Sequence, residues 1–94
     1  MITPTLTKPH HIDGSPHRFY EFENGNTASL IRFIQGDDYA TGIESYGARE
    51  GLYEICTITP NGDYVDMVGF LDEDDVMREL ERRQAEPRGM VYEY

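Results

Sequence analysis

The sequence predicts an α+β domain in which a small antiparallel sheet, built from two β-hairpins, packs against one C-terminal helix. Two Asn-Gly pairs, Asn24-Gly25 and Asn61-Gly62, each separate apolar segments, and this dipeptide is the strongest short turn signal for a hairpin. Four consecutive acids at 72–75 precede apolar residues at helical spacing. A chain of 94 residues has room for one modest hydrophobic core, so we expect a single domain.

The first seventeen residues are expected to form a flexible N-terminal arm, with the folded domain over residues 18–94. Pro4, Pro9 and Pro16 all lie in this arm. Because proline lacks a backbone N–H and fixes φ, three prolines in so short a stretch disfavour a regular element.

Residues 18–34, with the sequence RFYEFENGNTASLIRFI, are expected to form the first hairpin around a two-residue turn at Asn24-Gly25. Counting outward from that turn pairs Phe22 with Thr27 and Tyr20 with Ser29. Apolar side chains fall on both faces of these strands, so we expect both faces to be covered.

Residues 35–51 form a long, glycine-rich connection, and loops of this length are often functional. Residues 52–69 predict the second hairpin, turning at Asn61-Gly62. The expected pairs are Ile58–Val65, Cys56–Met67 and Ile55–Val68. The expected core face consists of Leu52, Cys56, Ile58, Val65 and Met67.

Residues 72–85 predict the helix. Asp72 suits the N-cap, Asp75 completes a capping box, and Leu71 with Val76 fits a hydrophobic staple. Acids in the first turn stabilise a helix by about 0.3–1 kcal/mol each, so the acidic run has a structural explanation that is compatible with a contact role. It lacks the glycine and the ligand spacing of a calcium loop. The tail at 90–94 is expected to add a short strand or an aromatic clamp.

The charge balance restricts the kinds of partner. Eight Lys and Arg against eighteen Asp and Glu give a net charge of −10. This charge disfavours direct binding to nucleic acids or anionic membranes, and it favours a basic partner, including a protein that itself binds DNA or RNA. A single cysteine permits no internal disulfide, and no signal-peptide or membrane-spanning pattern is present, so we expect a cytoplasmic protein.

Candidate chemistry is sparse. His10, His11, Asp13 and His17 are potential metal ligands, but the surrounding proline- and glycine-rich backbone presets no geometry, so a polar arm is the favoured interpretation. Cys56 lies within a predicted strand, where a buried inert thiol is expected. The sequence contains no nucleophile elbow or phosphate-binding loop. We therefore predict a non-enzymatic protein with no catalytic residues, metal or cofactor.

Tyrosines interleaved with carboxylates predict an interaction surface. Tyrosine supplies contact area at low entropic cost, and carboxylates around it steer a basic partner. The expected contacts are Asp37, Asp38, Tyr39, Glu44, Tyr46, Glu50, Asp63 and Asp66. The alternative is that some of these rings only cover the small core.

Three segments, YEFENGNTASLIR, SYGAREGLYEICTI and VGFLDEDDVMRELERR, resemble a family of small acidic proteins encoded by bacteriophages and prophages. The matching positions are Ala28, Ser29, Leu30, Tyr46, Gly47, Gly51, Leu52, Tyr53, Glu54, Gly69, Phe70 and Leu71. The resemblance implies a phage origin, and no catalytic residues carry over from it. Small acidic phage proteins include inhibitors of host machinery, such as anti-CRISPR proteins and other nucleic-acid mimics.

The first hypothesis is therefore a phage-encoded inhibitor that acts in the host bacterial cytoplasm. It would bind the basic nucleic-acid site of a host defence complex such as a CRISPR effector, which holds nucleic acid in positively charged channels. One alternative is a phage accessory or regulatory module that binds another protein and inhibits nothing. A further alternative is a small metal-dependent enzyme that uses the histidine arm. The oligomeric state and the mode of inhibition stay open.

Overall fold

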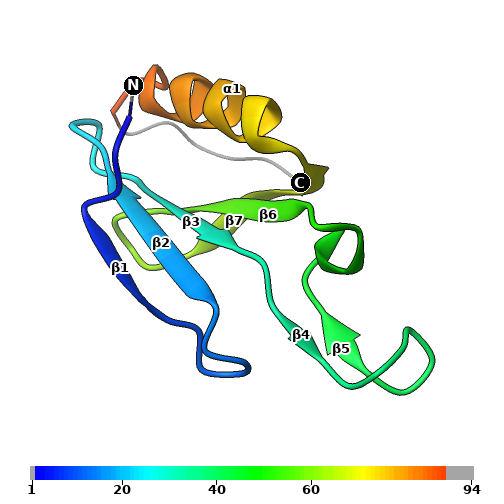
Figure 1. Ribbon diagram of the computed structural model, residues 1–94. Coiled ribbons are helices and arrows are strands. Elements are labelled where there is room, and N and C mark those ends of the chain that lie inside the picture. Colours follow the sequence, from blue (N-terminus) through cyan, green and yellow to red (C-terminus); the bar gives the residue numbers. More distant parts are fainter. Residues whose placement is uncertain (1, 89–94) are drawn as a thin grey trace.

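The computed structural model describes residues 2–88 and has the predicted α+β architecture (Figure 1). Within this range, five antiparallel strands form a sheet in the order β1-β2-β3-β6-β7, a separate pair β4-β5 extends from it, and one helix, α1, packs on the sheet. The elements are β1 (Leu6–Pro9), β2 (Pro16–Glu21), β3 (Thr27–Ile31), β4 (Ile34–Gln35), β5 (Ile43–Glu44), the 3-10 turn η1 (Ala48–Glu50), β6 (Tyr53–Ile58), β7 (Tyr64–Leu71) and α1 (Glu73–Gln84). The tail at 90–94, expected to form a strand or clamp, lies outside the described residues.

Both predicted hairpins form, but each closes with a three-residue loop, so the predicted two-residue turns are wrong. In the first hairpin the Phe22 N–H donates to the Asn26 carbonyl at 3.0 Å, and Gly25 adopts a φ of 91°. Gly62 takes the same place in the second hairpin with a φ of 88°. A tight turn that ends in a left-handed glycine is the usual form of a three-residue hairpin loop.

The register of the first hairpin is consequently shifted by one residue from the prediction. Thr27 pairs with Glu21 instead of Phe22, and Tyr20 pairs with Ala28 instead of Ser29. The three-residue loop accounts for this shift. Within that loop, the Asn24 side chain is buried against the end of α1. Its Nδ2 donates to the carbonyls of Arg83 and Glu86 at 3.0 and 2.9 Å.

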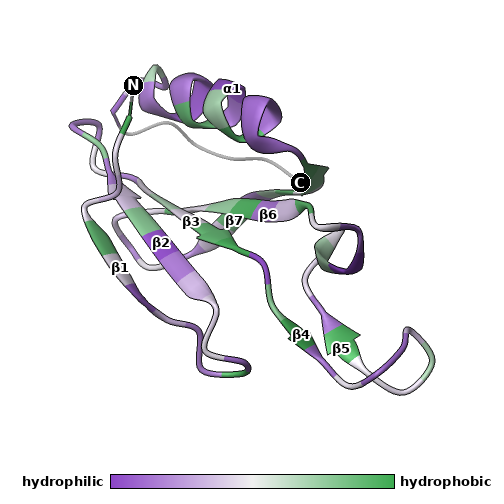
Figure 2. Cartoon of the chain, viewed as in Figure 1, coloured by the Kyte–Doolittle hydropathy of each residue, from purple (hydrophilic) through white to green (hydrophobic). Residues whose placement is uncertain are grey.

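The helix covers the opposite face of the second hairpin from the one predicted. The core consists of Tyr20, Ala28, Leu30, Ile55, Leu71, Val76 and Leu80. Met67, expected in the core, is 53% exposed, whereas Ile55 is fully buried. Figure 2 shows the apolar part of α1 toward the sheet and its hydrophilic part on the outer side.

Strand β6 alternates regularly, and its Ile55 side faces the core. Two irregularities in β7 explain why Val68 and Leu71, instead of Met67, lie at that core. Ile58 pairs with Tyr64 instead of Val65, because the three-residue loop moves the register by one residue. The shift between Thr57 and Ile55 moves it back, so the expected pair Ile55–Val68 is confirmed. Asp66 and Phe70 lie at the two irregularities with φ values of 55° and 58°. Each bulge adds a residue and reverses the alternation of side chains, so a regular alternation assigns the wrong residues to the core.

The N-terminal segment contributes a strand, which corrects the prediction of a flexible arm over residues 1–17. Strand β1 pairs with β2 from Leu6–Phe19 to Pro9–Pro16. Proline is tolerated here because β1 is an edge strand and both prolines lie at strand ends. The loop between the two strands is closed by the His10 N–H, which donates to the Ser15 carbonyl at 2.7 Å.

Helix α1 begins as predicted. Asp72 is its N-cap, and the reciprocal capping box with Asp75 is present. Leu71 before the cap and Val76 after it are both buried in the core, as the staple requires. Among the described residues, no helix has the length and apolar character needed to cross a membrane.

Candidate functional site

The candidate site starts at an arm, residues 34–44, formed by β4, β5 and the turn between them. Predicted as part of an unstructured connection, this arm is a short two-stranded sheet that extends away from the main sheet (Figure 1). Asp38 shapes its turn by accepting hydrogen bonds from the backbone and the hydroxyl of Thr41 at 3.0 and 3.1 Å. These bonds favour the carboxylate and lower the pKa of Asp38. The neighbouring Asp37 is exposed at the tip.

Arg49, in η1, ties the arm to the rest of the molecule. Its Nε–H donates to Glu44, and its guanidinium lies 5.3 Å from the centroid of the Tyr39 ring. The Tyr39 hydroxyl donates to Glu50 Oε1 at 2.7 Å, and this bond is the main reason that the pKa of Tyr39 is raised. Glu44 is thus a half-buried partner of Arg49, while Tyr39 remains 62% exposed.

An exposed pair of aromatic rings, Tyr46 and Phe70, lies next to η1. The ring centroids are 6.4 Å apart and the ring planes differ by 13°. Each residue is 59% exposed. The backbone beneath them is tight: the Phe70 N–H donates to the Tyr46 carbonyl at 3.1 Å, and a Cβ on Gly69 would fall 2.2 Å from Tyr46 Cβ. We call Tyr46 and Phe70 the aromatic pair.

The structure brings together six of the eight predicted contact residues. Asp37, Asp38, Tyr39, Glu44, Tyr46 and Glu50 all belong to the arm or to the segment that joins it to β6. Asp63 lies in the β6–β7 turn, at the other end of the sheet (Figure 1). Asp66 lies in the first bulge of β7, which is also away from the arm.

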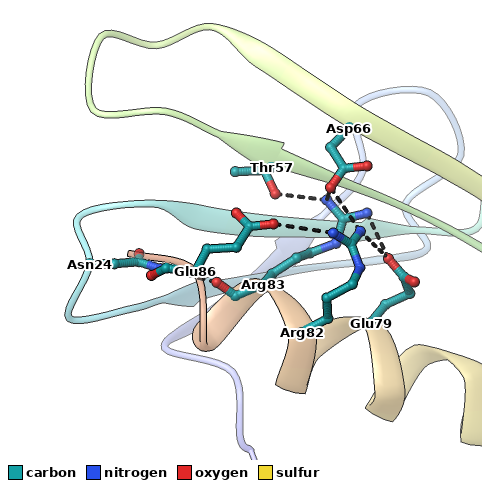
Figure 3. Close-up of polar contacts among 7 residues, drawn as sticks. All are labelled: Asn24, Thr57, Asp66, Glu79, Arg82, Arg83 and Glu86. Carbon is teal, nitrogen blue, oxygen red and sulfur yellow. Dashed lines mark hydrogen bonds and ion pairs between the residues drawn. The ribbon is translucent and has the colours of Figure 1, made fainter. Parts of the chain in front are cut away.

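Asp66 has internal partners at the C-terminal part of α1 (Figure 3). Its Oδ2 lies 2.7 Å from Arg82 Nη2 and 3.6 Å from Arg83 Nη1. Arg83 is fully buried, and it also donates to Thr57 Oγ1 at 2.7 Å and to Glu79 Oε1 at 2.9 Å. This network joins the helix to the sheet, so Asp66 stabilises the fold and does not contribute to the surface around the arm.

The three histidines form an aromatic stack. The ring centroid of His10 lies 4.5 Å from that of Phe33, 4.6 Å from that of His11 and 5.4 Å from that of His17. The Asp13 carboxylate is engaged by Ser15 and by the backbone N–H of Ile34. Within residues 2–88, no group of three or more His, Cys, Asp or Glu side chains has an arrangement that could hold a metal ion.

Cys56 is buried on the side of the sheet away from α1. Burial is the main reason that the pKa of its thiol is raised. A raised pKa disfavours the thiolate, which is the reactive form. This environment agrees with the inert buried thiol predicted from the sequence.

Sequence reasoning missed Phe70 as a surface residue. Regular alternation along β7 gives no sign of the second bulge. The only local signal is Gly69, which permits the close approach of Tyr46. Comparisons with models of protein families, with curated proteins and with solved structures each found no match.

Proposed function

We propose that this chain is a non-enzymatic binding protein that attaches to the basic nucleic-acid site of a host defence complex, such as a CRISPR effector, and excludes nucleic acid from it. The observation that carries the proposal is the joint placement of carboxylates and exposed tyrosines at the arm, on a chain with a net charge of −10. The resemblance to small acidic phage proteins directs the proposal toward a defence complex.

The physical argument combines steering with contact. Carboxylates attract a basic surface over roughly 10 Å at about 0.1 M salt and raise the rate of encounter. Exposed rings such as Tyr39 and Tyr46 supply the buried contact area that holds the complex together. A positively charged nucleic-acid channel matches such a surface, because it presents basic residues that are otherwise neutralised by phosphates.

The test is a pull-down with the tagged chain from a bacterial lysate that contains a CRISPR effector, at about 0.1 M and about 0.5 M salt. The proposal expects capture of a basic nucleic-acid-binding complex at low salt, its loss at high salt, and competition by added DNA. Capture that resists high salt, or capture of partners without a basic surface, would contradict it.

Two charge-matched variants test the location of the surface. The double variant Asp37→Asn with Glu50→Gln removes two charges at the arm, and the new amide at position 50 retains an acceptor for the Tyr39 hydroxyl. The control, Glu23→Gln with Asp63→Asn, removes two exposed charges near the opposite hairpin turns. Capture should weaken in the first variant and stay close to wild type in the second. Equal weakening would mean that only the bulk charge matters.

The second candidate is an accessory module that binds another phage protein through apolar contacts. It would use exposed apolar side chains outside the acidic residues, such as Ile43 and Met67, which are 51% and 53% exposed. Because apolar burial responds little to ionic strength, this function predicts a partner that survives about 0.5 M salt. The same pull-down therefore separates the two functions.

A further inference from the structure

The backbone holds the rings of the aromatic pair, Tyr46 and Phe70, at the surface, and attraction between charges does not explain why they are exposed there. We infer that the pair receives the guanidinium of an arginine side chain from the basic partner, so that the protein selects arginine-rich over lysine-rich surfaces. This inference rests on the proposed function and assigns a specific ligand group to its interface.

The geometry of the pair suits a planar cation. The rings are nearly parallel, at 13°, with centroids 6.4 Å apart, and both residues are more than half exposed. A cation within about 6 Å of a ring centroid is attracted by the ring quadrupole. A guanidinium is flat and weakly hydrated and therefore stacks on such a ring, whereas an ammonium is compact and strongly hydrated.

The chain already uses this chemistry within itself. The guanidinium of Arg32 lies 4.7 Å from the ring centroid of Tyr53, and that of Arg49 lies 5.3 Å from that of Tyr39. Among residues 2–88, no comparable Lys or Arg contact is found on Tyr46 or Phe70. The aromatic pair is thus an exposed ring surface that is not occupied by a cation of the described chain.

The position of the pair is fixed before any partner arrives. Phe70 has a φ of 58°, a conformation that a residue with a side chain adopts only when its surroundings impose it. Those surroundings are the hydrogen bond from its N–H to the Tyr46 carbonyl and the close contact of Gly69 with Tyr46. The bulge turns the ring of Phe70 outward at a fixed place, which reduces the entropy lost on binding.

Carboxylates around the pair complement a cation. Glu54 lies beneath it and accepts a hydrogen bond from the Tyr46 N–H at 2.9 Å. Asp72, Glu73 and Asp74 begin two residues after Phe70 and are exposed at the start of α1. Figure 1 shows that the start of α1, η1 and the arm lie at the same end of the molecule. Negative charge at this end of the molecule favours a cation over a neutral aromatic or aliphatic group.

The experiment uses calorimetric titration of the full chain with two homopeptides of equal length, one of arginine and one of lysine, at low salt. Wild type should bind the arginine peptide more tightly than the lysine peptide. Phe70→Ala should weaken arginine-peptide binding by about fivefold or more and reduce the preference for arginine. Phe70→Trp should restore both, because it retains a π face.

Two further variants control for folding and for general exposure. Phe70→Gly removes the ring and also relieves the positive φ, so it should bind as poorly as Phe70→Ala while staying folded by circular dichroism. Tyr64→Ala removes a ring that is 67% exposed on the other end of β7, and it should bind like wild type.

The outcomes distinguish this inference from the proposed function. Equal affinity for both peptides, with no effect of Phe70→Ala, would overturn the arginine site and leave the acidic surface intact. Equal weakening by Tyr64→Ala and Phe70→Ala would also overturn it, because the pair would then be no different from any exposed ring. Failure of wild type to bind either peptide would overturn both the arginine site and the charge-driven function.

Discussion

At the scale of single residues, the most constrained side chain is Arg83. It is fully buried, and its guanidinium is held by Thr57, Glu79 and Asp66 (Figure 3). These contacts engage both Nη atoms, whereas the buried Nε has no hydrogen-bond partner. A buried cation depends on such partners, because an uncompensated charge is costly in a medium of low dielectric constant. Removal of any one of these partners should therefore lower the free energy of unfolding, because it leaves part of the buried guanidinium without a partner.

Thr57→Val tests this dependence. The change keeps the shape of the side chain but removes the hydroxyl that accepts from Arg83 Nη1, so the free energy of unfolding should fall by about 1–3 kcal/mol. The measurement is urea unfolding at neutral pH. The Arg83→Met variant has no guanidinium that could lose a hydrogen bond. In that background, Thr57→Val should lower the free energy of unfolding by less than about 0.5 kcal/mol. An equal loss of stability in both backgrounds would mean that the hydrogen bond to Arg83 does not account for the effect of Thr57→Val.

At the scale of elements, the turn of the first hairpin also ends the helix. Asn24 donates two hydrogen bonds from Nδ2, one to the Arg83 carbonyl in the last turn of α1 and one to the Glu86 carbonyl just after the helix. Its Oδ1 accepts from the Asn26 N–H at 2.9 Å and so fixes the local turn. One side chain thus connects the turn between β2 and β3 to the C-terminal end of α1.

Asn24→Asp should separate this role from simple turn propensity. Aspartate keeps the acceptor for Asn26 but loses both donors and places a negative charge at the negative end of the helix dipole. We expect a loss of about 2 kcal/mol in the free energy of unfolding, measured by denaturant titration. Asn61→Asp is the matched control, since Asn61 has the same place in an exposed turn, and it should change stability by less than about 0.5 kcal/mol.

At the scale of the whole molecule, the histidine stack joins distant segments. His10 and His11 lie between β1 and β2, and Phe33 follows β3. His17 lies in β2 and shares a hydrogen bond with Ser29 Oγ at 2.7 Å. The pKa values of His10 and His17 are lowered, chiefly by burial and then by neighbouring imidazoles. The native state therefore holds both rings neutral at a pH where an unfolded chain binds protons.

The sign of the pH dependence follows from that difference. Since the folded pKa values lie below 6.5, the unfolded state binds more protons as the pH falls through 6.5, and stability decreases. We expect a lower midpoint of urea unfolding at about pH 5.5 than at about pH 7.5 for wild type. His17→Gln removes one titrating ring and keeps a polar partner for Ser29, so it should reduce the dependence. If the variant showed the same pH dependence of stability as wild type, the titration of His17 would be excluded as a cause of that dependence.

Asp13 contributes to stability at lower pH than the histidines do. Hydrogen bonds from Ser15 and from the Ile34 backbone lower the pKa of Asp13 to about 2. Its stabilising contribution is therefore present above the ordinary carboxyl range and is lost as the pH falls from about 3.8 toward 2. Loss of stability between about pH 7.5 and about pH 5.5 is thus assigned to the histidines and not to this carboxylate.

The sequence by itself determined the elements whose causes are local. The two Asn-Gly turns, the Asp72–Asp75 capping box and the net charge all follow from a few adjacent residues or from composition. Six of the eight predicted contact residues fell together for a related reason, because they lie within one short segment of the chain.

Only the tertiary structure decided the docking of the first hairpin turn on α1, the buried face of the second hairpin and the exposure of Phe70. The bond from Asn24 to the Arg83 carbonyl at the end of α1 spans 59 positions of the chain, and no local pattern encodes it. The bulges at Asp66 and Phe70 reverse the side-chain alternation, and each bulge coincides with a long-range contact, from Asp66 to Arg82 and from the Phe70 N–H to the Tyr46 carbonyl. These features depend on contacts between segments far apart in the chain, so they exist only once the helix and the sheet have packed together.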